Sequence, residues 1–307
     1  MSATRELTVG VIGAGRVGAV LAAALRAAGH HVVAASGVSA AAKHRIGTLL
    51  PGARNLPADE VARAATDLLL VAVPDDALAG VVTGLAATGA LRPGQIVAHT
   101  SGAHGLAVLA PAAAVGARPL ALHPAMTFTG GAGDLRRLRG ISYGVTAPDA
   151  TLRELAADLV ADLGGTPEWI GEQQRALYHA GLAHGANHLV TLVNEAADRL
   201  RDAGVFDPAK VLGPLLTAAL DNALRMGDAA LTGPVSRGDA GTVARHVQVM
   251  RETAPDSLPA YVALARRTAD RAIAGGRLRP RDAEPLLGVL AGSATGAGYS
   301  EIGEAAK

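Results

Sequence analysis

The sequence contains no cysteine at all among its 307 residues. Disulfide bonds, thiolate nucleophiles and cysteine-ligated zinc or iron–sulfur sites are therefore excluded, and we expect no metal. Lysine is scarce too, because only Lys43, Lys210 and Lys307 occur. No apolar run reaches the roughly 18 uninterrupted residues of a membrane span. The first six residues lead directly into a strand and show no signal peptide, so we expect a cytoplasmic protein with no membrane partner.

The charge is nearly balanced, with a formal net charge of +1. A nucleic-acid-binding protein would show a basic stripe, so we expect no nucleic-acid partner. Half of the residues are apolar, and the chain is long enough for two domains with separate cores.

The stretch from Leu7 to Gly18 has the pattern of a dinucleotide site. An apolar, β-branched run leads into Gly13-x-Gly15-x-x-Gly18, and an Ala/Leu-rich helix follows. Gly13 permits the tight turn, Gly15 lets the backbone approach a pyrophosphate, and Gly18 lets the helix pack on the strand. The free amides at the start of the helix then offer an anion site.

The end of the second predicted strand, His31 to Ser36, indicates which cofactor binds. NAD-specific sites usually carry an acid there that binds the ribose 2′-hydroxyl. Here Ser36 and Ser39 occupy the loop, and Lys43 or Arg45 follows. Hydroxyls and cations accept a 2′-phosphate that a carboxylate would repel. We therefore expect NADP(H), with NAD(H) as the less favoured cofactor.

Three further predicted strands, Asp67–Val73, Gln95–His99 and Ala117–Leu122, each end in a loop of small, polar or histidine residues. In an open α/β sheet such loops gather at the carboxyl edge, where ligands bind. The residues expected to contact the dinucleotide are Gly13, Ala14, Gly15, Arg16, Val17, Gly18, Ser36, Ser39, Lys43, Val73, Pro74 and Thr100. The segment Asp134–Arg139 is predicted to be a solvated turn.

The predicted fold is a Rossmann-type, doubly wound, mostly parallel α/β sheet followed by an all-α C-terminal domain. We place the dinucleotide-binding domain at residues 1–170, a helical substrate and dimerisation domain at 171–292, and a flexible tail at 293–307. A long helix is expected over Glu172–Ala203, and its apolar middle suggests burial between domains or subunits. Asp239 is expected to cap the helix that carries His246.

Together these features resemble the Rossmann-like oxidoreductases that join a dinucleotide fold to an all-helical C-terminal domain. That group includes 6-phosphogluconate dehydrogenase, ketopantoate reductase and pyrroline-5-carboxylate reductase. Within it, the chain resembles a subgroup with a C-terminal domain of unknown function. The matching elements are His123-Pro124 with Phe128, Tyr178-His179 with Asn187, and Gly233-Pro234 with Arg237-Gly238-Asp239, Thr242 and His246. The resemblance implies an NAD(P)-dependent reductase that forms a homodimer through its helical domains.

The chain departs from that group at one catalytic position. Many of its members place a lysine proton donor on the long helix, four residues before an asparagine. Here Ala183 precedes Asn187 by that spacing. Histidine is the natural substitute as an acid near neutral pH, which makes His179 the candidate donor and Tyr178 its neighbouring alternative.

The remaining catalytic candidates bind the substrate. His179 and Asn187 lie two helical turns apart, so one ligand could contact both. Ser101 would hydrogen-bond the substrate, and Arg237 would clamp a carboxylate of a small anionic substrate.

The predicted function is therefore NADP(H)-dependent reduction of a small carboxylate-bearing carbonyl compound, of the 2-dehydropantoate (ketopantoate) type. An imine reductase of pyrroline-5-carboxylate type is the first alternative, because an iminium already carries its proton. A non-catalytic NADP-binding regulatory protein is the second.

Overall fold

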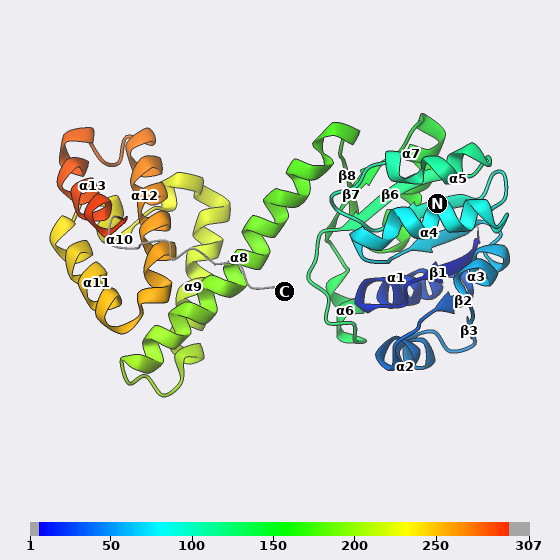
Figure 1. Ribbon diagram of the computed structural model, residues 1–307, viewed down its shortest axis with the longest axis horizontal. Helices are drawn as coiled ribbons and strands as arrows, with labels where there is room; N and C mark the ends of the chain where they lie inside the picture. Colours follow the sequence, from blue (N-terminus) through cyan, green and yellow to red (C-terminus); the bar gives the residue numbers. More distant parts are fainter. Residues whose placement is uncertain (1–5, 295–307) are drawn as a thin grey trace, which may run out of the picture. The chain divides into compact units, whose positions relative to one another are not determined.

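The computed structural model describes residues 6–294 and divides into two compact units, one up to His188 and the other from Leu189 (Figure 1). The boundary lies inside one long helix, α8 (Arg175–Asp202). The sequence places the boundary after residue 170, whereas contacts group the first half of α8 with the sheet. The predicted tail begins within α13, which runs to Ala294, and its remainder lies outside the described residues.

The first unit is built on an eight-stranded sheet in the order β3-β2-β1-β4-β5-β6-β7-β8. All neighbouring pairs are parallel except β6 and β7. The first six strands have the order of a dinucleotide-binding fold, so the predicted fold class is confirmed. The strands are β1 (Thr8–Ile12), β2 (His31–Ser36), β3 (Arg54–Asn55), β4 (Leu68–Val71), β5 (Ile96–His99), β6 (Arg118–Pro124), β7 (Ser142–Thr146) and β8 (Thr166–Trp169).

Helices cover both faces of this sheet (Figure 1). Alternate residues of β4 enter different cores: Leu68 and Leu70 join a cluster with α1 and α7, and Leu69 and Val71 join a cluster with α3 and α4. Strands buried on both faces therefore read as continuous apolar runs. The helices of this unit are α1 (Arg16–Ala27), α2 (Ala40–Leu49), α3 (Ala58–Ala64), α4 (Asp75–Ala87), η1 (Ala107–Leu109), α5 (Ala110–Ala114), α6 (Gly133–Arg137), α7 (Ala150–Asp162) and η2 (Glu172–Gln174).

The prediction that Asp134–Arg139 forms a solvated turn is wrong in one respect. Asp134 is fully buried in the short helix α6, and its carboxylate accepts hydrogen bonds from the amides of Thr129 and Gly130. This carboxylate holds the loop that follows β6, because the Gly130 amide would otherwise be buried without a partner.

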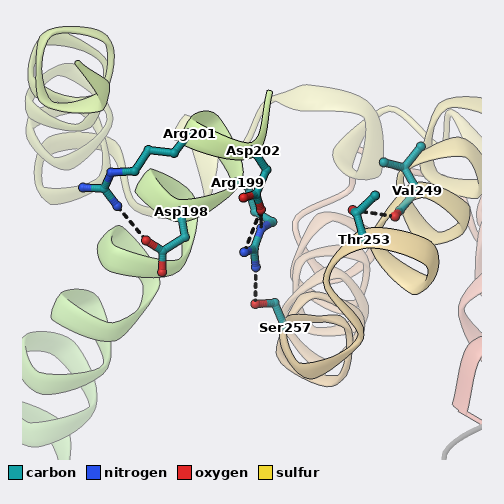
Figure 2. A network of polar contacts seen from close by, with 7 residues as sticks. All are labelled: Asp198, Arg199, Arg201, Asp202, Val249, Thr253 and Ser257. Carbon is teal, nitrogen blue, oxygen red and sulfur yellow. Dashed lines mark hydrogen bonds and ion pairs between the residues drawn. The ribbon is translucent and has the colours of Figure 1, made fainter. Parts of the chain in front are cut away.

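The second unit is helical, and its core lies among α11, α12 and α13. Asp239 caps α11 by accepting the Thr242 amide, as predicted. Figure 2 shows the polar network at the end of α8, where Arg199 donates to both Asp202 and Ser257. The elements of this unit after α8 are α9 (Pro208–Met226), η3 (Gly227–Ala230), α10 (Gly233–Ser236), α11 (Ala240–Thr253), η4 (Pro255–Ser257), α12 (Leu258–Ala274) and α13 (Pro280–Ala294). Over the described residues, no helix combines the length and the apolar character needed to cross a membrane.

Candidate functional site

The glycine turn after β1 has the geometry that the motif predicts. Gly13 has φ +87°, and a Cβ there would lie 2.5 Å from the Ala72 carbonyl oxygen. A Cβ at Gly18 would lie 2.3 Å from the Gly13 carbonyl oxygen, so the helix packs directly on the turn. A Cβ at Gly15 would find its nearest neighbour 3.9 Å away. The first and third glycines are thus needed by the fold, while the second leaves open space for a ligand.

The N-terminus of α1 is available to an anion. Gly15 caps this helix without a side-chain hydrogen bond, and the first turn carries no acidic residue. The turn is held from behind, because the amides of Gly13 and Ala14 donate to the Ser36 carbonyl. An uncapped helix start with free amides and a favourable dipole fits a pyrophosphate. The residues present therefore fit the dinucleotide that the motif implies.

The loop after β2 carries hydroxyls and cations. Ser39 caps α2 by accepting the Ala42 amide, and Lys43 is exposed on the first turn of that helix. A Cβ at Gly130 would lie 2.6 Å from Arg45 Nε and 2.8 Å from Arg16 Cγ. Two arginines therefore approach one point beside the glycine turn.

The predicted contacts on the neighbouring strands lie at the same edge of the sheet. Val73 and Pro74 lie two and three residues after the end of β4, and the Thr100 amide donates to the Val71 carbonyl. Because β1, β4, β5 and β6 are parallel, their carboxyl ends meet at this edge. Among residues 6–294, no three His, Asp or Glu side chains are grouped so that they could hold a metal ion.

The beginning of α8 is fastened to this edge by Arg175, whose side chain is 1% exposed. Its guanidinium donates to the carbonyls of His104 at 2.9 Å, Gly144 at 3.0 Å and Ser101. One turn earlier, the Glu172 carboxylate accepts the Leu106 amide. Both charged side chains hydrogen-bond backbone groups, and the buried Arg175 cation is accommodated by three carbonyl dipoles.

Two glycines on the sheet side make room for side chains of α8. A Cβ at Gly102 would lie 2.5 Å from His179 Cδ2, and a Cβ at Gly144 would lie 2.5 Å from the Tyr178 hydroxyl oxygen. Neither glycine has a positive φ. Close approach of the helix, not backbone conformation, therefore requires glycine at both positions.

Between the loop after β6 and α8 lies a cleft of about 270 Å³. His123 and His179 meet in it, with ring centroids 5.8 Å apart and an interplanar angle of 77°. The Tyr178 hydroxyl lies 3.1 Å from His123 Nδ1, to which it is hydrogen-bonded. The lining residues are His123, Ala125, Met126, Thr127, His179, Leu182, Ala183, Ala186 and Asn187. None of them is a lysine or arginine.

The environment shifts the proton affinities of several groups at this edge. Burial lowers the pKa of His123 to about 4, and the Arg175 guanidinium and His179 act in the same direction. Burial also lowers the pKa of His99 to about 4. Burial raises the pKa of Tyr178, against the opposing effect of Arg175. His123 is consequently a neutral imidazole at pH 7 and can be a hydrogen-bond donor or acceptor.

Within the first unit, the structure brings two of the predicted catalytic residues together in the cleft. His179 and Asn187 line the cleft. Ser101 is buried, and its hydroxyl oxygen accepts the amides of Ala103 and His104, so it supports the loop. Arg237 lies exposed in the second unit, at the end of α10. The catalytic roles of all four residues stay predictions.

Sequence reasoning missed two positioning residues and underweighted a third. Arg175 and Glu172 look like solvated charges at the start of a long helix. The sequence contains no signal that distinguishes them, because their partners are backbone atoms 31 to 74 residues away. His123 was visible as the histidine of His-Pro at a strand end, but only the fold places it against His179.

Comparisons with known proteins agree with this architecture. Residues 2–124 match the model of the Rossmann-like domain. The chain thus has a Rossmann-like N-terminal domain. Residues 141–268 match a domain of unknown function, DUF2520, as the resemblance predicted. A search of curated proteins finds no match.

Several solved structures are similar over nearly their whole length. A protein from Bacteroides fragilis assigned as an NADP oxidoreductase has 20% identity and a TM-score of 0.73, over 86% of this chain and 98% of that one. A reductive aminase from Aspergillus terreus, solved with NADPH and ethyl levulinate, has 18% identity and a TM-score of 0.59, over 89% and 95%. Pyrroline carboxylate reductase from Plasmodium falciparum, solved with NADP, has 12% identity and a TM-score of 0.55, over 87% and 98%. At these identities the similarity establishes the fold.

Proposed function

We propose that this protein is an NADP(H)-dependent oxidoreductase that reduces a small carboxylate-bearing carbonyl compound. One observation carries the proposal. The open glycine turn and the His123–His179 cleft lie along the carboxyl edge of the same sheet, and the loop that lines the cleft at Thr127 reaches Arg16 at Gly130. A dinucleotide whose pyrophosphate rests on α1 would therefore extend along the edge that bears the cleft.

Preference for the phosphorylated cofactor is supported by charge. In the described part of the chain, none of Arg16, Lys43 and Arg45 forms an ion pair with a carboxylate. Ser36 stands where an acid would select NAD(H). Free cations and hydroxyls beside the glycine turn favour a ligand that carries a 2′-phosphate.

The bound cofactor would supply a hydride to the carbonyl carbon. Residues of the chain then protonate the carbonyl oxygen and orient the substrate. His179 donates a proton to the oxygen as the C=O π bond breaks, which gives the alcohol, and the solvent returns a proton to the ring. Asn187, two turns along α8, orients the substrate through its amide, and the apolar side chains of Leu182 and Ala186 exclude water.

A second candidate, reduction of a cyclic imine of pyrroline-5-carboxylate type, is favoured by one feature of the cleft. Its lining includes no lysine, and an iminium ion needs no proton donor. The similar folds of a pyrroline carboxylate reductase and a reductive aminase are compatible with this alternative. Ketopantoate-type and pyrroline-5-carboxylate-type substrates therefore both enter the test.

The test has two stages. NADPH and NADH affinities are measured by fluorescence titration, and NADPH oxidation is then followed with 2-ketopantoate, other small 2-keto acids and cyclic imines. We expect NADPH to bind at least about 10-fold more tightly than NADH, because a 2′-phosphate gains charge-assisted hydrogen bonds. S36D should reverse that order, and T83D on exposed α4 is the charge-matched control.

Binding of neither nucleotide would overturn the proposal. Binding without oxidation by any compound of the panel would favour the regulatory protein instead. Tighter binding of NADH would show that the cofactor assignment is wrong.

A further inference from the structure

The Tyr178–His123 hydrogen bond determines which nitrogen of the His123 ring carries the proton. In the described residues, His123 Nδ1 is the acceptor within hydrogen-bonding distance of the half-buried Tyr178 hydroxyl. A phenol O–H enclosed by protein without an acceptor costs free energy. The hydroxyl is satisfied when it donates to Nδ1. A neutral imidazole that accepts at Nδ1 carries its hydrogen on Nε2.

The Nε2 atom has no partner within the described residues, yet it is not sealed from solvent. Tyr143 alone has a fully buried side-chain polar atom without a hydrogen bond in residues 6–294. His123 Nε2 is therefore accessible, and the residue lines the cleft. It lies 3.0 Å from the point where a Cβ of Gly102 would stand, beside the His179 ring. An accessible N–H donor thus lies next to the ring of the proposed proton donor.

We propose that neutral His123 donates its Nε2–H to the oxygen of a substrate carbonyl group, and that Tyr178 is the positioning residue that holds this tautomer. The inference rests on the reductase function proposed above. It also narrows the substrate class. A carbonyl oxygen accepts this hydrogen bond, whereas the N–H of an iminium ion would meet a second donor. The geometry therefore favours ketones and aldehydes over protonated imines.

The two histidines then have different tasks. His123 stabilises the negative charge that develops on the oxygen, in the manner of an oxyanion-hole donor. His179 supplies the proton. The lowered pKa of His123 supports this division, because an imidazole that remains neutral from pH 5 upward donates a hydrogen bond and does not serve as the acid.

The first test reads the tautomer directly. Nitrogen-15 NMR of the ten histidines in the full chain distinguishes Nε2–H, Nδ1–H and imidazolium rings, and the spectrum of H123N assigns the His123 signal. We expect the Nε2–H form of His123 throughout pH 6–8. Y178F should produce a mixture of tautomers. Y261F is the matched control, because Tyr261 makes the same kind of bond to His246 Nδ1 at 3.0 Å, and it should leave the His123 signal unchanged.

The second test compares two replacements during NADPH oxidation with keto acids. H123N lacks a donor at the Nε2 position, and kcat should fall about 100-fold, as for loss of one oxyanion-hole donor. H123Q places an amide N–H near that position and should recover at least about 10-fold of the loss. Y178F should lower kcat by a smaller factor and leave NADPH affinity unchanged.

The outcomes separate this inference from the proposed function. An Nδ1–H or charged His123 at pH 7 overturns it even if the protein reduces keto acids. Full activity of H123N also overturns the inference, as does turnover of cyclic imines without turnover of keto acids. In both cases the oxidoreductase function would still stand. If NADPH is oxidised with neither keto acids nor cyclic imines, both the proposed function and the catalytic role of His123 are wrong.

Discussion

Gly102 and His179 are in such close contact that no side chain fits between them: a Cβ at Gly102 would lie 2.5 Å from Cδ2 of the imidazole. The contact joins a loop after β5 to a helix 77 residues further along the chain. It places the imidazole in the cleft beside His123.

We expect G102A to displace the His179 ring while the protein still folds. Backbone strain is not involved, because φ of Gly102 is not positive. Turnover should fall at least about 10-fold, as misplacement of a catalytic group by about 1 Å is costly, and NADPH affinity should be unchanged. G80A on α4 is the control, because nothing lies within 4 Å of its added Cβ. Equal kcat values for G102A and wild type would contradict the prediction.

The three glycines of the turn should separate folding from cofactor binding. G15A has room in the fold, since the nearest atom would be 3.9 Å from its Cβ, but the methyl group occupies the ligand's approach. Its melting temperature should match wild type, while the NADPH dissociation constant rises at least about 10-fold. G13A and G18A should unfold at lower temperature, because each Cβ would meet a backbone oxygen within 2.5 Å. Unchanged NADPH affinity in G15A would argue against a pyrophosphate at this turn.

Arg175 should stabilise the fold through the geometry of its hydrogen-bond donors rather than through its positive charge alone. R175K keeps the positive charge but lacks the planar fork that serves three carbonyls. We expect the free energy of unfolding to fall by about 3 kcal/mol, because buried carbonyls lose their donors. R201K is the control: the Arg201–Asp198 pair in Figure 2 is exposed, and such pairs contribute about 0–1 kcal/mol. Urea unfolding of both variants measures the difference, and equal losses would refute the role of Arg175.

Stability should decrease as the pH falls from 6.5 towards 4. The pKa values of His99 and His123 are lowered to about 4 in the folded protein, mainly by burial. Between these limits the unfolded chain binds more protons, so the free energy of unfolding rises with pH. Full protonation of either histidine lowers the free energy of unfolding by roughly 3 kcal/mol.

The pH dependence can be assigned with two matched variants. H99N should flatten the curve, because it removes one titrating group. H31N, at an exposed position on β2, should leave the curve unchanged. Urea midpoints between pH 4.5 and 7.5 provide the measurement, and a flat wild-type curve would contradict the lowered pKa values.

The helical unit should pair with a second copy of itself. Along α9, Leu215 is 61% exposed and Leu224 is 79% exposed, and apolar surface of this kind marks an interaction site. We expect a dimer in light scattering at micromolar concentration and a monomer for L215D/L224D. V38D changes a valine that is 89% exposed in the other unit, so it should remain dimeric. A monomeric wild-type protein would contradict the proposed dimer.

The sequence alone determined the parts of the protein that depend on neighbouring residues. The β-branched run, the spaced glycines and the helix after them specify β1, the turn and α1, because turn geometry and helix propensity act within a few residues. The alternation of buried strands with helices predicted the doubly wound sheet. The long helix and the Asp239 cap were readable for the same reason.

Only the tertiary structure decided which distant residues share the cleft. Arg175 satisfies carbonyls far back in the chain, and Gly102 and Gly144 are small because α8 lies against them. The folded loop alone shows that the Ser101 hydroxyl oxygen accepts two of the loop's own amides. His123 acquired its partners from another element. Such contacts join residues with no local pattern in common, so they exist only once the helix has packed onto the sheet.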